Sequence, residues 1–208
     1  AHMFEHAVNS AIATPPADYV RETCPDQYVG MLHQLKSNAI DFPCRQLAEA
    51  SCFNGKMAIL ILESPHTREF VKPVGPAKGS TGRLIRLYLH EILSAYDNYD
   101  FGIFLVNAIQ NQCSLGRSPK RYPYRDVVFK TAWNSYGQAD FIRRLSSLAN
   151  VREALVINAC TLGRGVGSET SRREWVEEAV FKALNRASEI RITHPEFWAS
   201  SSSRKERW

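Results

Sequence analysis

Short runs of apolar residues alternate along the chain with longer segments in which apolar positions recur every three or four residues. The clearest runs are MAILIL at 57–62, FGIFLVNA at 101–108 and ALVINA at 154–159, and a weaker run, EIRIT, spans 189–193. Turn residues bound these runs, so each is predicted to be a strand buried on both faces. Such strands, alternating with amphipathic helices, predict an α/β fold with a parallel sheet that is covered by helices on both sides.

Three segments between and after these runs have helical spacing. They are residues 81–96, residues 141–149, which follow a connector rich in Trp and Tyr, and residues 168–187. Ser168 or Thr170 would cap the last of these helices.

We expect a single domain over residues 4–208. At 208 residues and 44% hydrophobic composition, the chain can bury one sizeable core. Residues 4–55 are expected to add one or two helices to an α/β core at 56–208, and residues 1–3 read as a cloning scar.

Composition excludes several classes of protein and site. No apolar run approaches the ~18 to 20 residues of a membrane helix, and no signal segment opens the chain, which predicts a cytoplasmic protein with no membrane partner. The five cysteines include no C-x-x-C pair and no His at ligand spacing. We therefore expect reduced thiols, no metal, no cofactor and a monomeric protein.

The distribution of charge favours an anionic partner. The formal net charge is +5, and the stretch GRSPKRYPYR at 116–125 contains basic residues and two tyrosines but no acid. The basic residues in question are Arg117, Lys120, Arg121 and Arg125, with Arg204 in the C-terminal segment. Basic groups interleaved with aromatic rings suit a phosphate backbone and stacked bases. The alternative is an ordinary solvated loop.

Polar side chains follow the predicted strands, at the position where functional residues of a parallel sheet gather. Glu63, Ser64 and His66 come after the first strand, Asn107 after the second and His194 after the fourth. A metal site would need more carboxylates or thiolates in this group, and no Gly-Lys-Ser/Thr P-loop is present.

A glycine-bearing segment, GPAKGSTGRLI at 75–85, precedes the first of the predicted helices. Its backbone N–H groups, together with Lys78 and Ser80, could hold one DNA phosphate at the helix N-terminus. The alternative is a flexible turn in which Ser80 or Thr81 caps the helix.

Four stretches, in this order, resemble the motifs of the uracil-DNA glycosylase superfamily: LILESPHTREF, KPVGPAKGSTGRLI, FLVNAIQ and ITHPEFW. The resemblance spans roughly residues 57–198. It implies a three-layer α/β/α sandwich around a central four-stranded parallel sheet. It also implies monofunctional cleavage of the N-glycosidic bond that joins a base to its sugar in DNA.

The resemblance carries over to individual residues. Glu63 falls on the glutamate of the iron–sulfur-bearing branch, and Ser64 falls where the uracil-specific branch has its catalytic aspartate. Asn107 matches the asparagine that reads the base, and His194 matches the histidine that faces the base O2. Trp198 matches the position of the residue that enters the duplex.

The sequence also departs from the superfamily pattern. His66 replaces the tyrosine that shields C5 in the uracil-specific branch, and Pro73 stands where a phenylalanine is expected. The cysteine spacings of the iron–sulfur branch are missing. Because no residue identified in the sequence closes the pocket against a 5-substituent, the favoured substrate is a modified pyrimidine. Glucosylated hydroxymethylcytosine of phage DNA, removed in defence, is one example, and uracil is the principal competitor.

The chemistry of base removal gives these residues expected roles. The nucleotide must leave the stack, and Phe197 or Trp198 would fill the gap, unless both pack in the core. A neutral His194 would donate to the departing base, and its alternative is a capping or core histidine. Glu63 would orient or deprotonate water, and its alternative is a buried ion pair with an arginine such as Arg83.

The remaining site residues have smaller expected roles. Asn107 would pair with the base edge through its amide, or would satisfy backbone groups at the strand end. Ser64 would hydrogen-bond the water or a phosphate, and His66 would line the pocket near the C5 position.

Two other classes of function stay open. A non-catalytic DNA-binding module of the same fold would keep its activity after Glu63→Gln and His194→Ala. A hydrolase of free nucleotides or nucleosides would need no polymer and would depend little on Trp198 or Arg121.

Overall fold

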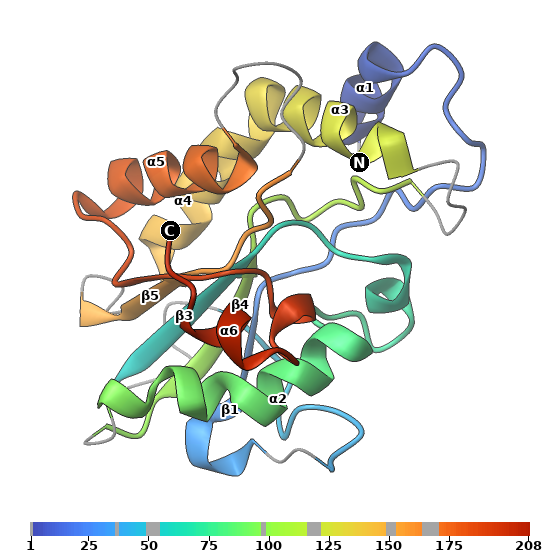
Figure 1. The fold of residues 1–208 in the computed structure, drawn as a ribbon. Coiled ribbons are helices and arrows are strands. Elements are labelled where there is room, and N and C mark those ends of the chain that lie inside the picture. Colours follow the sequence, from blue (N-terminus) through green and yellow to red (C-terminus); the bar gives the residue numbers. More distant parts are fainter. Residues whose placement is uncertain are drawn as a thin grey trace.

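The protein has an α/β fold in which a mixed six-stranded sheet is covered by helices on both sides (Figure 1). The structure is a computed structural model that describes residues 2–35, 38–48, 55–96, 99–115, 122–148, 153–163 and 171–208. The strands are β1 (Gln27–Met31), β2 (Gln46–Leu47), β3 (Met57–Leu62), β4 (Gly102–Asn107), β5 (Leu155–Asn158) and β6 (Ile190–Arg191). Their order across the sheet is β2-β1-β4-β3-β5-β6.

Four of these strands coincide with the four predicted apolar runs. β3 pairs in parallel with β4 and with β5, and β5 pairs in parallel with β6. β1 and β2 lie in the N-terminal region, for which the sequence predicts helices, and they pair antiparallel. The expected count of four strands is therefore wrong, because two further strands extend the sheet beyond β4.

The helices divide between the two faces of the sheet (Figure 1). They are α1 (His2–Ala11), α2 (Ser80–Ile92), α3 (Tyr122–Ala132), α4 (Gln138–Ser147), α5 (Arg172–Leu184) and α6 (Ser201–Lys205). Residues of α1, α3, α4 and α5 share one core with one side of the sheet. Residues of α2, together with Trp198, share the second core with the opposite side.

The central strand shows why its sequence has no polar position. All six side chains of β3 are buried. Ile59 and Ile61 belong to the core on one face, whereas Leu60 and Leu62 belong to the core on the other. Successive side chains of a strand point to opposite faces, so a strand between two helical layers must be apolar throughout.

Residues 16–35 do not form the helices predicted for the N-terminal region. They form a loop, β1 and one short 3-10 turn, η1 (Leu32–Gln34). Gly30 adopts a φ of +111°, and a Cβ at this position would lie 2.5 Å from Cγ of Pro43. The pairing of β1 with β4 shifts register between Tyr28 and Met31, as at a β-bulge. Residues 4–55 therefore contribute strands to the sheet as well as a helix.

The helix starts also differ from the predictions. α2 begins after Gly79, which has a φ of +80°, and no side chain caps it. α5 begins after Ser171, whose hydroxyl accepts a hydrogen bond from the backbone of Glu174. The predicted caps at positions 168 and 170 lie outside the described residues. α3 occupies a segment that the sequence assigns to a loop and connector.

Between α3 and α4 the helix continues through a π-helical turn, η5 (Trp133–Gly137). Two further short turns matter for the site: η2 (Thr67–Phe70) after β3, and η7 (Pro195–Phe197) after β6. None of the helices described in this structure combines the length and the apolar composition needed to cross a membrane.

Candidate active site at the carboxyl ends of the parallel strands

The carboxyl ends of β3, β4 and β6 open into one pocket of about 500 Å³. Residues singled out from the sequence that line it are Glu63, Ser64, His66, Lys78, Ser80, Asn107, Arg125 and His194. Other polar or charged residues in its lining are Arg68, Glu69, Thr81, Ser114, Thr161 and Glu196. The structure thus brings together all the residues that the sequence assigns to catalysis and base binding.

The register of the sheet explains why these residues meet. β3 and β4 pair with Leu62 opposite Asn107, so Asn107 and Glu63, the residue after Leu62, lie at the same edge of the sheet. The segments that follow the two strands stay paired through their backbones. Ala108 N–H donates to the carbonyl of Leu62 over 2.9 Å, and Ile109 N–H donates to that of Glu63 over 3.1 Å.

Glu63 is held in a buried ion pair. Its carboxylate Oε1 lies 2.8 Å from Nη1 of Arg172, and both side chains are less than a tenth exposed. The Ser64 hydroxyl lies 3.5 Å from the same oxygen. Burial raises the pKa of the Glu63 carboxyl above its ordinary value, and the Arg172 and Arg125 guanidinium groups act in the opposite direction. The ion-pair alternative is therefore present, but the partner is Arg172 and not Arg83.

Two residues of α3 complete a charged cluster around Glu63. Nη2 of Arg172 lies 2.9 Å from Oδ1 of Asp126, and Nε of Arg125 lies 3.5 Å from that same oxygen. Nε of Arg125 also lies 3.9 Å from Oε1 of Glu63. The Arg125 side chain is about one-third exposed (34%) and lines the pocket, so it is the cation of the cluster that a ligand can reach.

His194 presents a neutral imidazole to the pocket. Burial, followed by the charges of Arg125 and Arg172, lowers the pKa of His194 to about 4. Its Nδ1 accepts a hydrogen bond from the backbone N–H of Glu196, at 3.3 Å. An Nδ1 that accepts carries no proton, so in the neutral ring the proton resides on Nε2. His194 is both the N-cap of η7 and a hydrogen-bond donor available to the pocket.

Asn107 is buried, and its backbone and its side-chain amide differ in their hydrogen bonding. The backbone N–H of Asn107 donates to Oδ1 of Asp26, and its carbonyl accepts from Arg144. Its side-chain amide Nδ2 has no hydrogen-bond partner within the part of the chain that the structure describes. Buried polar groups are normally satisfied, so an unpaired amide at the pocket wall is suited to a ligand.

The first turn after β3 is held by a buried glutamate, Glu69, which the sequence does not single out. Its carboxylate accepts hydrogen bonds from the backbone N–H groups of His66, Ala77 and Lys78. Burial raises the pKa of Glu69 to about 7, against the effect of these hydrogen bonds. His66 caps η2 and is exposed at the pocket.

The glycine-bearing segment contributes two predicted residues to the pocket. The ammonium of Lys78 donates to the carbonyls of Val71, at 2.6 Å, and Pro73, so this cation also fastens its own loop. Ser80 is exposed in the first turn of α2.

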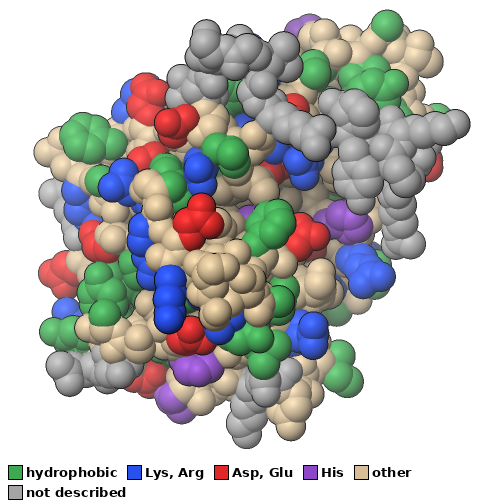
Figure 2. All heavy atoms as spheres, in the orientation of Figure 1, with side chains coloured by type: hydrophobic (Ala, Val, Ile, Leu, Met, Phe, Trp, Pro, Cys, Tyr) green, Lys and Arg blue, Asp and Glu red, His purple; other side chains and the backbone are tan. Residues whose placement is uncertain are grey.

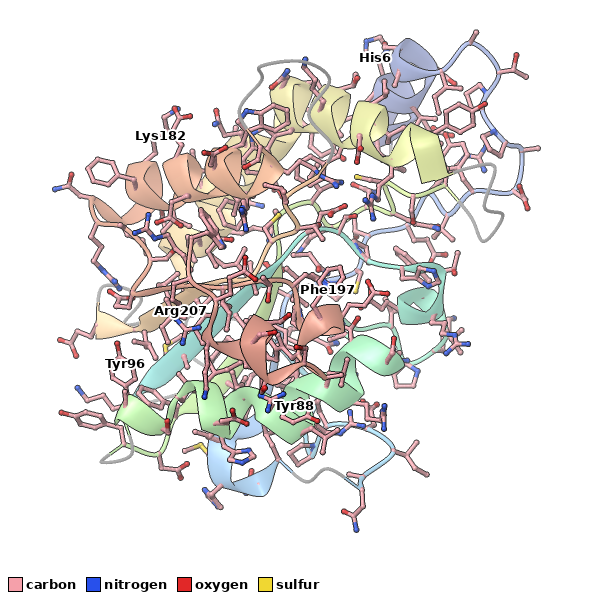
Figure 3. All side chains as sticks on the ribbon, viewed as in Figure 1. His6, Tyr88, Tyr96, Lys182, Phe197 and Arg207 are labelled. Carbon is pink, nitrogen blue, oxygen red and sulfur yellow. The ribbon has the colours of Figure 1, made fainter. Side chains whose placement is uncertain are left out.

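The two aromatic residues after His194 have different positions. Phe197 is 56% exposed and lies on η7, labelled in Figure 3. Trp198 is fully buried in the core beneath α2, and its indole N–H donates to the carbonyl of Thr193 over 2.8 Å. The assignment of Trp198 to DNA contact is therefore corrected, because its ring is part of the core.

Arg204 also makes its contacts within the protein. Its guanidinium lies 4.1 Å from the ring centroid of Tyr88 and 3.0 Å from a carboxylate oxygen of Glu91, both on α2. It further donates to the carbonyl of Trp198. Only 12% of the Arg204 side chain is exposed, and its guanidinium is taken up by these contacts within the protein rather than free for the predicted contact with DNA.

The basic residues Arg117, Lys120 and Arg121 lie outside the described residues. On the face drawn in Figure 2, Lys and Arg side chains are interspersed with Asp and Glu and do not form one patch. The described residues contain no group of three or more His, Cys, Asp or Glu side chains that could hold a metal ion. Cys24, Cys44, Cys113 and Cys160 are free thiols.

Arg172, Asp126 and Glu69 are the site residues that the sequence does not reveal. Arg172 lies 109 positions from Glu63, and only the docking of α5 brings the two together. The run of charges at the start of α5 is the one signal present, and it does not specify a partner.

A search of protein-family models finds no match to this chain, and a search of curated proteins finds none either.

Proposed function

We propose that this protein is a monofunctional DNA glycosylase, which extrudes a base from DNA and hydrolyses its N-glycosidic bond to leave an abasic site. The observation that carries the proposal is the convergence of Glu63, Asn107 and His194 on one pocket. They supply a carboxylate, an unpaired amide and a neutral imidazole donor. The same residues carry the resemblance to the uracil-DNA glycosylase superfamily, and the parallel order β4-β3-β5-β6 is compatible with its sandwich fold.

Each group has a defined task in this reaction. The bond from C1′ to the base nitrogen breaks with its electron pair on the base, so negative charge grows on the base and positive charge on the sugar. His194 Nε2–H donates to a base oxygen, and Asn107 pairs with the base edge. Glu63 stabilises the cationic sugar and accepts the proton that water loses when it adds to C1′. Loss of one preorganised donor typically costs roughly 2.7 to 4 kcal/mol of barrier.

The surface around the pocket supplies the contacts to DNA. Phe197, exposed beside His194, enters the space that the extruded nucleotide leaves, which offsets the few kcal/mol of unstacking. Ser80, Lys78 and the basic segment at 117–121 contact phosphates.

A modified pyrimidine is the proposed base. At about 500 Å³ the pocket has the size of a small-molecule site, and its lining includes the proposed phosphate contacts Lys78 and Ser80 as well as the residues proposed to face the base. His66 is exposed at the position proposed to face C5, where a shielding tyrosine would exclude a 5-substituent. Glucosylated hydroxymethylcytosine, with a role in defence against phage, fits this opening, and uracil is its competitor.

A panel of DNAs tests the proposal. Duplex and single-stranded oligonucleotides that contain uracil, hypoxanthine, hydroxymethylcytosine or glucosylated hydroxymethylcytosine are incubated with the protein and then treated with alkali. We expect strand breaks with at least one modified base, and their loss in Glu63→Gln and His194→Ala. Exposed Glu178→Gln serves as the control. No break with any substrate, across a range of salt, overturns the proposal.

The same panel, extended by the corresponding free nucleosides and nucleotides, separates the competing functions. Release of base from free nucleosides or nucleotides at an equal rate would indicate a hydrolase of small substrates. Salt-sensitive binding without breaks, unchanged in Glu63→Gln, would indicate a non-catalytic DNA-binding module.

A further inference from the structure

In the charged cluster around Glu63, the two arginines lie at different distances from the Glu63 carboxylate. The Arg172 guanidinium donates a hydrogen bond to Glu63 through Nη1 over 2.8 Å, whereas its Nη2 lies 2.9 Å from Oδ1 of Asp126 as an ion pair without hydrogen-bond geometry. Arg125 is farther from Glu63, at 3.9 Å, and is one-third exposed. Arg172 is therefore the main counter-charge of Glu63, and Asp126 competes for it.

Arg172 is fixed from several sides. It lies in the first turn of α5, and its backbone N–H donates to the carbonyl of Leu162 over 3.1 Å. Its guanidinium lies 5.5 Å from the centroid of the Phe129 ring. Gly163 has a φ of +74°, and a Cβ there would lie 2.3 Å from Nε of Arg172. The chain thus leaves space for this guanidinium by placing a glycine against it.

A carboxylate as buried as Glu63 would take up a proton if it stood alone, because a buried charge without a partner is unfavourable. A protonated Glu63 could neither stabilise a cationic sugar nor accept a proton from water. We propose that Arg172 is a positioning residue that keeps the Glu63 carboxylate charged and fixed in the pocket, and that Asp126 weakens this hold by sharing the same guanidinium. The inference rests on the proposed role of Glu63 in base removal.

Other charged or titratable groups also lie near Glu63. Arg125 adds positive charge from α3, and Ser64 lies within hydrogen-bonding distance. The buried thiols of Cys113 and Cys160 have raised pKa values, to which the Glu63 charge contributes after burial itself. His194 stays neutral next to the two arginines. None of these groups is a second full counter-charge for Glu63.

Variants of the two partners should shift the Glu63 titration in opposite directions. Arg172→Gln should raise the pKa of Glu63 by at least about one unit, and Asp126→Asn should lower it, because Arg172 then serves one acid. Arg172→Lys, which keeps one charge, should give an intermediate value. The measurement is a ¹³C NMR titration of the Glu63 carboxyl carbon, assigned with Glu63→Gln.

A further variant controls for the loss of any buried ion pair. Arg144 is likewise shared by two acids, Asp26 and Asp140, and it donates to the carbonyls of Asn107 and Ala108 rather than to Glu63. Asp140→Asn matches Asp126→Asn in charge and exposure, and it should leave the Glu63 titration unchanged. Where Arg172→Gln does not fold, Asp126→Asn and Arg172→Lys decide the question.

Activity is read alongside the titration. The acid limb of the pH profile for base release should move with the pKa of Glu63, by about tenfold in rate per unit below the limb. An unchanged titration in folded Arg172→Lys and Asp126→Asn overturns the inference even when wild-type protein releases base. If the titration shifts as expected and no DNA loses a base, the proposed function fails while the hold of Arg172 on Glu63 stands.

Discussion

At the scale of single residues, the site depends on which atom of His194 carries the proton. The Glu196 N–H directed at Nδ1 and the pKa of about 4 both keep a donor on Nε2 at neutral pH. A charged imidazole would instead repel Arg125 and Arg172. His194 can thus meet an oxygen that gains negative charge without itself adding to the positive charge of the cluster.

This state of His194 predicts an effect on stability. An unfolded histidine titrates near pH 6.5, so between about pH 4 and 6.5 the unfolded chain binds the additional proton. The contribution of His194 to stability should therefore be complete above pH 6.5 and decline as the pH falls toward 4. Denaturant unfolding of wild type and His194→Asn across this range checks the difference in slope. Equal slopes, or an Nδ1–H tautomer in ¹⁵N NMR spectra, would contradict the assignment.

Phe197 and Trp198 are adjacent but should respond differently to truncation. Trp198→Ala should lower the free energy of unfolding by about 3 to 5 kcal/mol, because it removes a fully buried ring. Phe197→Ala should change it by less than about 0.5 kcal/mol. On duplex substrate, Phe197→Ala should slow base release by at least about tenfold, with a smaller effect on single strands, where no stack has to be opened. Equal losses on both substrates would assign Phe197 a different role.

At the scale of elements, the parts that the sequence predicts are those set by local pattern. β3, β4 and β5 are recognisable because both faces are buried, which leaves an unbroken apolar run. β1 is irregular and contains Gly30 at positive φ, so it shows no alternation. α3 follows a basic stretch with prolines, and its buried residues, such as Phe129, become evident only when α1 packs against it.

The residues of the site also divide into those predictable from local sequence pattern and those that depend on tertiary packing. Glu63, Asn107 and His194 could be predicted because each lies at or shortly beyond the carboxyl end of a strand, and these ends of parallel strands meet. Arg172 could not, since its partner depends on where α5 docks. Adjacent Phe197 and Trp198 could not be distinguished either, because the tertiary packing of η7 decides which ring turns inward.

Glu69 links the turn after β3 to the loop before α2, and replacing it should destabilise both segments. Its oxygens accept backbone N–H groups from the turn after β3 and from the loop before α2. Glu69→Gln puts an amide N–H₂ against one of these donors, so we expect a loss of about 1 to 3 kcal/mol in the free energy of unfolding. Exposed Glu178→Gln, which loses only its pair with Lys182, should cost no more than about 0.5 kcal/mol. Urea unfolding compares the two variants. A similarly small loss in both would show that Glu69 does not hold the turn after β3 and the loop before α2 together.

At the scale of the whole molecule, the net charge of +5 does not by itself locate a DNA-binding surface. Among the described cations that line the pocket, Lys78 donates to its own loop, Arg125 lies in the acidic cluster, and Arg68 is the third. Cations elsewhere on the molecule add to the attraction that these three exert on DNA. The basic segment at 117–121, which directly precedes α3 and Arg125, is the part of the sequence best supplied with them.

Salt dependence measures that contribution. Each phosphate contact adds roughly −0.9 to the slope of log K against log salt on duplex DNA and roughly −0.7 on single strands. The combined change of Arg117, Lys120 and Arg121 to Gln should therefore make the slope shallower by about 1 per residue that contacts phosphate. The charge-matched control changes Lys56, Arg143 and Lys182 to Gln, which lie away from the pocket lining. Because both triple variants lose the same net charge, equal slopes would show that DNA responds to overall charge and would remove the 117–121 segment from the interface.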